Sequence, residues 1–224
     1  MKKILLLFFL GTTMLFAQDN ITMSLNDFET LKVYNGIDIE LIQSDKQELI
    51  ISGKKAEKVK VKLKNKTLKL TLRFPETMAE GDVKITLYFN KDISVIDVNE
   101  GVTLTSKAIE QGHIEVKAQE GAFVNMVVNT KHLTVKGSSG GVLKLSGTTK
   151  NETVKLDLAA TYHGYNLETT NMSVVKVGSG AKAEINAGES LDAKVTFGGT
   201  IFYRGTPEFL TEKKVIGGTI EQQD

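Results

Sequence analysis

Two glutamates stand at equivalent places of a repeating sequence, and they are the first candidates for chemistry. Glu100 and Glu120 each precede a glycine that recurs at intervals of about 20 residues. If these intervals are stacked coils, the two carboxyl groups lie about 5 Å apart, which suits a retaining glycosidase or the start of a calcium site. The next coil offers only Ser139 at this place, so the further ligands and catalytic partners are missing. We interpret both glutamates as exposed turn residues.

Two histidines also coincide in the repeat. His113 and His132 both lie eight residues before the recurring glycine, and Asn151 follows at the next equivalent position. Stacked imidazoles bind metals, but a tetrahedral site needs more His, Asp or Glu ligands than this row supplies. His163 falls on a different face of the coil. The sequence therefore predicts surface histidines and no metal site.

A row of lysines is the candidate binding surface. Four residues before each recurring small residue the chain carries Asp97 and then Lys117, Lys136, Lys155, Lys176 and Lys194. Equivalent residues of neighbouring coils lie about 4.8 Å apart, so the ammonium groups form a basic stripe. Such a stripe suits a polyanion, for example an acidic polysaccharide or the phosphates of a lipopolysaccharide. The other interpretation is a solvated strand face that carries lysine for solubility, with Glu115 and Asp192 offsetting its charge.

Four aromatic residues near the C-terminus leave two interpretations open. Tyr162, Tyr165, Phe202 and Tyr203 either stack on sugar rings from the surface or fill the end of the core. The enzyme motifs Gly-x-Ser-x-Gly, Gly-x-x-x-x-Gly-Lys-Ser/Thr and His-Glu-x-x-His do not occur in the chain. We therefore predict no catalytic residue, no cofactor-binding residue and no metal ligand.

The positions of all these residues depend on a repeat that starts near residue 93. Small residues recur 20, 19, 19, 21 and 18 residues apart, at Gly101, Gly121, Gly140, Ala159, Gly180 and Gly198. Five residues earlier stands an apolar column made of Ile96, Val116, Val135, Val154, Val175 and Ala193. One such unit cannot bury its apolar face alone, whereas stacked copies form a continuous core with tight bends at the small residues.

This repeat predicts an all-β fold, a right-handed parallel β-helix (β-solenoid) with coils of about 20 residues. A β-sandwich is the alternative, because it shares the alternating apolar and polar strand pattern. A second Gly-Gly-Thr-Ile, at Gly217–Ile220, repeats the one at Gly198–Ile201 and predicts a last partial coil.

The segment from 18 to 90 is rich in strands but repeats less regularly. Its predicted strands are Phe28–Val33, Ile37–Gln43, Glu48–Ser52, Val59–Lys64, Thr67–Leu72 and Val83–Phe89. Because a solenoid needs its ends covered, this segment is either an N-terminal cap or the irregular first coils of the same helix. Residues 91–224 carry the β-helix repeats, and we expect 18–224 to form one continuous domain.

The first 17 residues have the pattern of a secretory signal peptide. Lys2 and Lys3 precede an apolar run from Ile4 to Phe16, and Ala17 is a small residue at the expected cleavage point. The run is shorter than the roughly 20 apolar residues of a transmembrane helix, so we expect no transmembrane anchor. The predicted location is the periplasm, the outer surface or the extracellular space.

The composition of the chain excludes cysteine-dependent sites and argues against a nucleic-acid-binding protein. The chain has 0 cysteines, which rules out disulfides, thiolate metal sites and a lipid-modified cysteine. Its net charge of +1 is unlike the strongly basic balance of nucleic-acid-binding proteins.

Motifs near both ends of the mature chain resemble those of a known family, the putative auto-transporter adhesin head GIN domain of secreted Bacteroidetes-type proteins. The opening motif is Phe28 followed by Val33-Tyr34-Asn35-Gly36-Ile37 and continues to Gln43; the closing motif is Gly198–Pro207 with Ile216–Ile220. The resemblance implies a β-helical fold and a location in the envelope or outside the cell. It brings no catalytic residues with it.

We therefore expect a non-enzymatic secreted or cell-envelope protein, an adhesin-like binding module for a polyanionic glycan or another envelope component. Its expected partner is a glycan or a cell-surface component, without a cofactor and without nucleic acid. The alternatives are a structural envelope spacer that has no ligand and a polysaccharide-active β-helix enzyme.

Overall fold

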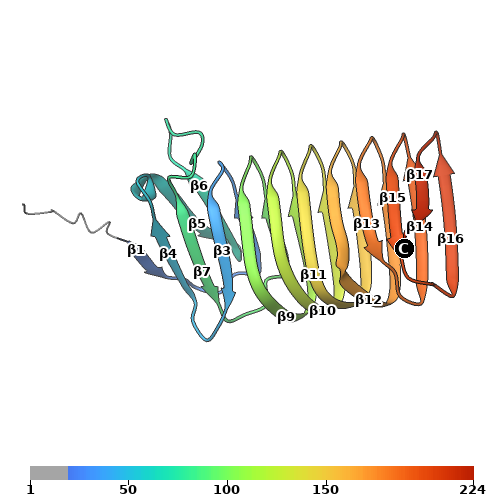
Figure 1. Cartoon of the computed structure of the whole chain (residues 1–224). Helices are drawn as coiled ribbons and strands as arrows, with labels where there is room; N and C mark the ends of the chain where they lie inside the picture. Colours follow the sequence, from blue (N-terminus) through green and yellow to red (C-terminus); the bar gives the residue numbers. More distant parts are fainter. Residues whose placement is uncertain (1–19) are drawn as a thin grey trace, which may run out of the picture.

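In the computed structural model, which describes residues 20–224, the alternating apolar and polar residues form stacked β-strands (Figure 1). The predicted signal peptide, residues 1–17, lies outside the described residues. The first strands are β1 (Ile21–Ser24), β2 (Thr30–Val33), β3 (Asp38–Gln43), β4 (Glu48–Ser52), β5 (Val59–Lys64), β6 (Thr67–Leu72) and β7 (Lys84–Phe89), with the 3-10 turn η1 (Ala56–Lys58) before β5. The later strands are β8 (Val95–Val98), β9 (Thr103–Ala118), β10 (Phe123–Gly137), β11 (Val142–Leu156), β12 (Thr161–Val177), β13 (Lys182–Asn186), β14 (Ser190–Thr196), β15 (Thr200–Arg204), β16 (Phe209–Val215) and β17 (Thr219–Gln222).

Each coil has two walls, which are joined by one tight turn and one wider bend (Figure 1). The start of β9 pairs with β3, whereas its end pairs with β8, so one long strand belongs to both walls. The wall that follows the tight turn along the chain is called the first wall. It holds β3, β7, β13, β15, β17 and the starts of β9 to β12. The second wall leads into the next turn and holds β2, β6, β8, β14, β16 and the ends of β9 to β12.

The core lies between the walls. The predicted apolar column of Ile96, Val116, Val135, Val154, Val175 and Ala193 points inward, and all its side chains are 0 % exposed. Neighbouring coils pair in parallel with a spacing of roughly 19 residues, in about seven turns. The predicted all-β solenoid is confirmed, and the sandwich alternative is not found.

The recurring small residues lie in the tight turn. Glu120 and Gly121 both have positive φ, of 54° and 72°. The Ala122 backbone N–H donates to the Gln119 carbonyl at 3.1 Å, which closes a two-residue type I′ turn. Glycine is favoured here for its left-handed conformation, since no atom would obstruct a side chain at Gly121. Crowding acts on the following position instead: a Cβ on Gly141 would lie 2.1 Å from a carbonyl oxygen of the preceding coil.

Turns of neighbouring coils are hydrogen-bonded to each other. The Gly101 N–H donates to the Glu120 carbonyl at 3.0 Å, and the Gly121 N–H donates to the Ser139 carbonyl at 3.1 Å. The same bond joins Ala159 to Ser179 further along, also at 3.1 Å. Because these bonds fix each turn to the next, equivalent residues of all coils stay aligned.

The N-terminal segment supplies both a coil and a cover for the stack. The coil made by β2 and β3 lies between β6–β7 and β8–β9, with which it pairs in parallel on either side. Strands β4, β1 and β5 are antiparallel: β4 pairs with β7, β1 with β4, and β5 with β6. These strands cover backbone groups that would otherwise form an open edge.

The C-terminal coil ends the core with charged residues. In the inward columns, Leu191, Ala193 and Val195 of β14 pair with Leu210, Glu212 and Lys214 of β16. Charges at inward positions of a terminal strand hinder the addition of another strand to the edge. Thr200 and Ile201 pair with Thr219 and Ile220, so the predicted last partial coil is confirmed.

Val154 provides a test of this register. Its side chain is 0 % exposed, whereas the neighbouring Thr153 points outward. Val154→Asp would bury an unpaired carboxylate at a cost of about 4 kcal/mol or more, so we expect this variant not to fold. Thr153→Asp adds the same charge to the surface and should melt like the wild type. Circular dichroism and thermal melting measure both; equal melting temperatures for the two variants would contradict the register.

Candidate functional site

The five predicted lysines are aligned on the outward face of the second wall. Parallel pairing places Lys117 opposite Lys136, Lys136 opposite Lys155, Lys155 opposite Lys176, and Lys176 opposite Lys194. The row continues to Lys213 in β16. Since neighbouring strands lie about 4.8 Å apart, the ammonium groups share one narrow strip along the solenoid. We call this strip the lysine row.

Glu115 divides the lysine row into two parts. Its carboxylate is 2.8 Å from Lys117 Nζ and 2.8 Å from Lys136 Nζ. Partial burial would raise the Glu115 pKa, but the hydrogen bonds from these two lysines hold it below its usual value. Among residues 20–224, neither Asp192 nor any other acid forms an ion pair with Lys155, Lys176 or Lys194. The uncompensated charge therefore lies in the C-terminal part of the row.

A hollow of about 320 Å³ opens where these three lysines lie, and we call it the Gly178 notch. It is lined by Lys155, Asp157, Lys176, Gly178, Lys194 and Thr196, with parts of the strands beneath. A Cβ on Gly178 would lie 2.7 Å from Thr196 Oγ1 and 3.4 Å from Asp157 Oδ1, so the glycine keeps the hollow open. Three ammonium groups around one hollow suit a phosphate, sulfate or carboxylate group.

Glu100 and Glu120 lie at the tips of adjacent turns, as the repeat indicates. Glu100 Oε2 accepts hydrogen bonds from the backbone N–H of Asn35 at 3.2 Å and from its Nδ2 at 2.9 Å. This carboxylate therefore binds one turn to the next. Within residues 20–224, no three His, Asp or Glu side chains are arranged to hold a metal ion.

The histidines lie in a side-chain ladder at the wide bend. The rings of His113 and His132 have centroids 6.5 Å apart, and His132 Nδ1 lies 3.4 Å from Asn151 Nδ2. His163 lies apart from them on the first wall, where its Nδ1 is 2.8 Å from Glu184 Oε2. His113 and His132 thus lie on a different part of the coil from His163, as the repeat predicts.

The structure divides the four aromatic residues between core and surface. Tyr162 is 0 % and Tyr203 is 5 % exposed, so both fill the core. Tyr165 and Phe202 lie on the outward face of the first wall. Tyr165 points outward by the strand alternation that follows the buried Tyr162 and Gly164, beside a β-bulge in β12. The Arg204 guanidinium lies 4.3 Å from the centre of its ring.

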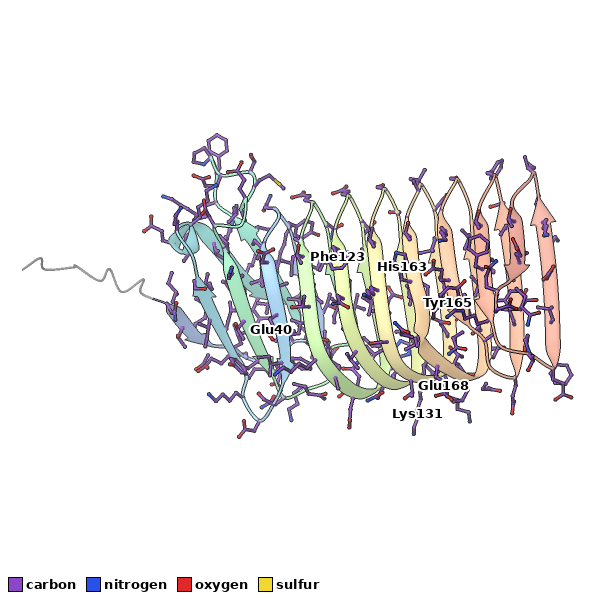
Figure 2. All side chains as sticks on the ribbon, in the orientation of Figure 1. Glu40, Phe123, Lys131, His163, Tyr165 and Glu168 are labelled. Atoms are coloured by element: carbon purple, nitrogen blue, oxygen red, sulfur yellow. The ribbon has the colours of Figure 1, made fainter. Side chains whose placement is uncertain are left out.

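A second hollow, of about 490 Å³, lies on the first wall beside Tyr165. Phe123, His163, Glu184 and Arg204 are among the side chains that line it, and Figure 2 labels Phe123 in β10 and His163 and Tyr165 in β12. The hollow combines aromatic and charged side chains.

Glu152 is a buried carboxyl group that the sequence analysis did not identify. It occupies an inward column in which the preceding coil places Leu133, and it is 2 % exposed. Tyr162 Oη donates to Glu152 Oε1 at 2.6 Å, while the Thr169 and Ser173 hydroxyls donate to Oε2 at 3.3 Å and 3.4 Å. Burial raises the Glu152 pKa to about 7, although the three hydroxyl donors oppose the shift. Because all four side chains are buried, this cluster belongs to the core and does not meet a ligand.

Comparisons with known proteins identify relatives of this fold. The family model described as "putative auto-transporter adhesin, head GIN domain" matches residues 27–207. A putative adhesin from Bacteroides fragilis has a similar structure, with a TM-score of 0.84, 20% sequence identity, and coverage of 92% of this chain and 97% of that one. Comparison with curated proteins gives no match.

Two further solved structures share the fold. A putative lipid binding protein from Parabacteroides distasonis has a TM-score of 0.69 and 16% identity, and the match covers 92% of this chain and 97% of that one. A putative adhesin from Parabacteroides merdae has a TM-score of 0.61 and 17% identity, with coverage of 92% and 96%. At these identities the similarity shows the architecture alone.

The buried Glu152 carboxyl predicts a pH dependence of stability. The folded protein keeps a proton up to about pH 7 that the unfolded chain loses near 4.5. The free energy of unfolding should therefore fall by roughly 3 kcal/mol as the pH rises through this window, and this loss should be absent in Glu152→Gln. Urea unfolding of both proteins at pH 4.5, 6 and 7.5 measures the difference. Glu168→Gln, at an exposed side chain of the bend (Figure 2), is the control; parallel profiles for wild type and Glu152→Gln would contradict the assignment.

Proposed function

The chain belongs to the family of the putative auto-transporter adhesin head GIN domain, and we propose that it is a non-enzymatic binding module of the cell envelope that holds an anionic polymer on the lysine row. Export is part of the proposal and is supported by the signal-peptide pattern of residues 1–17. No helix within residues 20–224 is long and apolar enough to cross a bilayer.

The observation that carries the proposal is the uncompensated part of the lysine row. Like charges that lie directly opposite each other on neighbouring strands are destabilising. The chain compensates Lys117 and Lys136 with Glu115, whereas within residues 20–224 no acid forms an ion pair with Lys155, Lys176 or Lys194, although Asp157 lines the same hollow. An anionic ligand would remove this repulsion, and the Gly178 notch gives it a place to sit.

The length of the row favours a polymer over a single small anion. From Lys155 to Lys213 the row crosses four neighbouring strands, which corresponds to roughly 14 Å. Several charges of a linear acidic polysaccharide can contact such a strip at once, and each contact adds to the binding. The same repeated contact would make binding sensitive to salt, because exposed charges are screened.

The first-wall hollow supports a second candidate location for the same class of ligand. There a sugar ring would stack on Tyr165, and Arg204 would bind an acidic substituent. The position of the Arg204 guanidinium, 4.3 Å from the centre of the Tyr165 ring, is the observation that favours this location. A Tyr165→Ala variant separates it from the lysine row.

The proposal predicts a loss of binding on charge reversal. Lys155→Glu with Lys176→Glu should weaken binding of acidic glycans at least about tenfold, because each reversal removes an attraction of about 1 kcal/mol and adds a repulsion. Lys131→Glu with Lys150→Glu makes the same charge change at exposed side chains outside the row and is the matched control. Binding of the mature chain to a glycan array at low and moderate salt measures the effect.

Three outcomes would overturn this assignment. Wild-type protein that shows no salt-sensitive binding to acidic glycans would remove the proposed ligand. Equal losses in the two double variants would mean that only net charge matters. Loss in Tyr165→Ala with full binding by the lysine variant would move the site to the first wall.

A further inference from the structure

One edge of the solenoid is formed by the tips of the tight turns, which follow each other along one side of the molecule (Figure 1). The first left-handed residue of each turn stands at the tip: Glu100, Glu120, Ser139, Leu158, Ser179, Phe197 and Ile216. We call this line of residues the turn edge. Its N-terminal part carries two acidic residues, and its C-terminal part carries three apolar residues interrupted by Ser179.

The three apolar tips are unusual for their positions. Leu158, Phe197 and Ile216 are 55%, 61% and 69% exposed, so the core does not account for them. Their φ angles are 48°, 50° and 55°, a conformation that bulky and β-branched residues rarely adopt. Neither burial nor backbone preference explains large apolar side chains here. A partner outside the molecule does, because exposed apolar groups that gather on one surface mark interaction sites, and here Ser179 alone interrupts the three apolar tips.

Lysines accompany these tips at a constant distance along the chain. Lys155, Lys194 and Lys213 each lie three residues before Leu158, Phe197 and Ile216. At a strand rise of about 3.3 Å per residue, the lysine backbones stand about 10 Å back from the tips. The edge therefore has an apolar front with a line of positive charge behind it.

A lipid surface has the complementary arrangement. Apolar groups of peripheral proteins enter the boundary between headgroups and acyl chains to a depth of about 5–10 Å, while lysines extend to the phosphates. The apolar line is one residue wide, which is too narrow for a stable protein–protein interface of about 1,200 Å² or more. A bilayer accepts such a line because its side chains enter one by one.

From this geometry we infer that the C-terminal part of the turn edge docks on an anionic lipid surface. Leu158, Phe197 and Ile216 enter the interfacial layer, and the lysines behind them bind lipid phosphates. Glu100 and Glu120 are repelled by the same surface, so contact is limited to the coils from β11 onward. The inference shares its lysines with the proposed function, whereas its apolar tips are independent of it.

The absence of tryptophan from the chain makes a direct test simple. Phe197→Trp places a single fluorophore at an apolar tip. Phe209→Trp is the matched control, because Phe209 is 63% exposed but starts β16 at the opposite edge. With vesicles of phosphatidylglycerol and phosphatidylcholine, the emission of the first variant should shift to shorter wavelength and that of the second should not. An unchanged emission of Phe197→Trp, or equal shifts in both variants, would overturn the inference.

A second pair of variants separates docking from glycan binding. Leu158→Ser with Ile216→Ser should reduce vesicle binding at least about tenfold in sedimentation and leave acidic glycan binding unchanged. Serine already occupies this position at Ser139 and Ser179, so the variant should fold. Undiminished vesicle binding by this variant, or equally strong binding of wild type to pure phosphatidylcholine vesicles, would contradict the docking mode. Lys155→Glu with Lys176→Glu should weaken both vesicle and glycan binding, because Lys155 serves both sites; intact vesicle binding in this variant would contradict the contact between the lysines and the lipid phosphates.

Discussion

The two-residue turn at the end of each coil is the constraint on which the other features depend. Its left-handed conformation reverses the chain from one wall to the other, and its hydrogen bond to the next turn, for example Gly101 to Glu120 at 3.0 Å, fixes the step between coils. A slip of one residue would exchange the inward and outward faces of a whole strand. The turns therefore keep Val135 in the core and Lys136 on the surface, as they do for the equivalent residues of the neighbouring coils.

Alignment has opposite consequences for apolar and charged residues. Inside, it gathers side chains such as Val116, Val135 and Val154 into a fully buried column. Outside, it places lysines directly opposite one another, which costs stability unless an acid or a ligand compensates. The uncompensated lysines and the strained apolar tips both occur in the coils from β11 to β16. Their concentration in one half of the solenoid is the reason why we place both proposed binding surfaces there.

Features that follow directly from the period of the repeat could be predicted from the sequence. Strand alternation and the spacing of Gly101, Gly121 and Gly140 were sufficient to derive the core columns and the alignment of the lysines. The next inward column lies two residues before the column of Val116, Val135 and Val154. It contains Ile114, Leu133, Glu152, Ser173 and Leu191, so the sequence already placed a charged residue, Glu152, in a largely apolar column. Its partner Tyr162 belongs to a different column, and only the fold brings the two together.

Other features depend on side-chain shape or on distant pairing, which the repeat does not encode. The Gly178 notch depends on Asp157 and Thr196, whose side chains lie close to a buried glycine. Beside Tyr165, β12 has an extra residue relative to β11, which interrupts the register locally. The insertion of the β2–β3 coil between β6–β7 and β8–β9 follows from long-range pairing that no local pattern indicates.

Lysine acetylation footprinting with mass spectrometry tests the central claim, that uncompensated lysines at the Gly178 notch form the binding site, most directly. The acetylation rates of Lys155, Lys176 and Lys194 are compared with that of Lys131 at the bend, with and without an acidic polysaccharide. The account predicts selective protection of the three notch lysines, with Lys131 unchanged. Uniform protection of all lysines, or none at the notch, would contradict it.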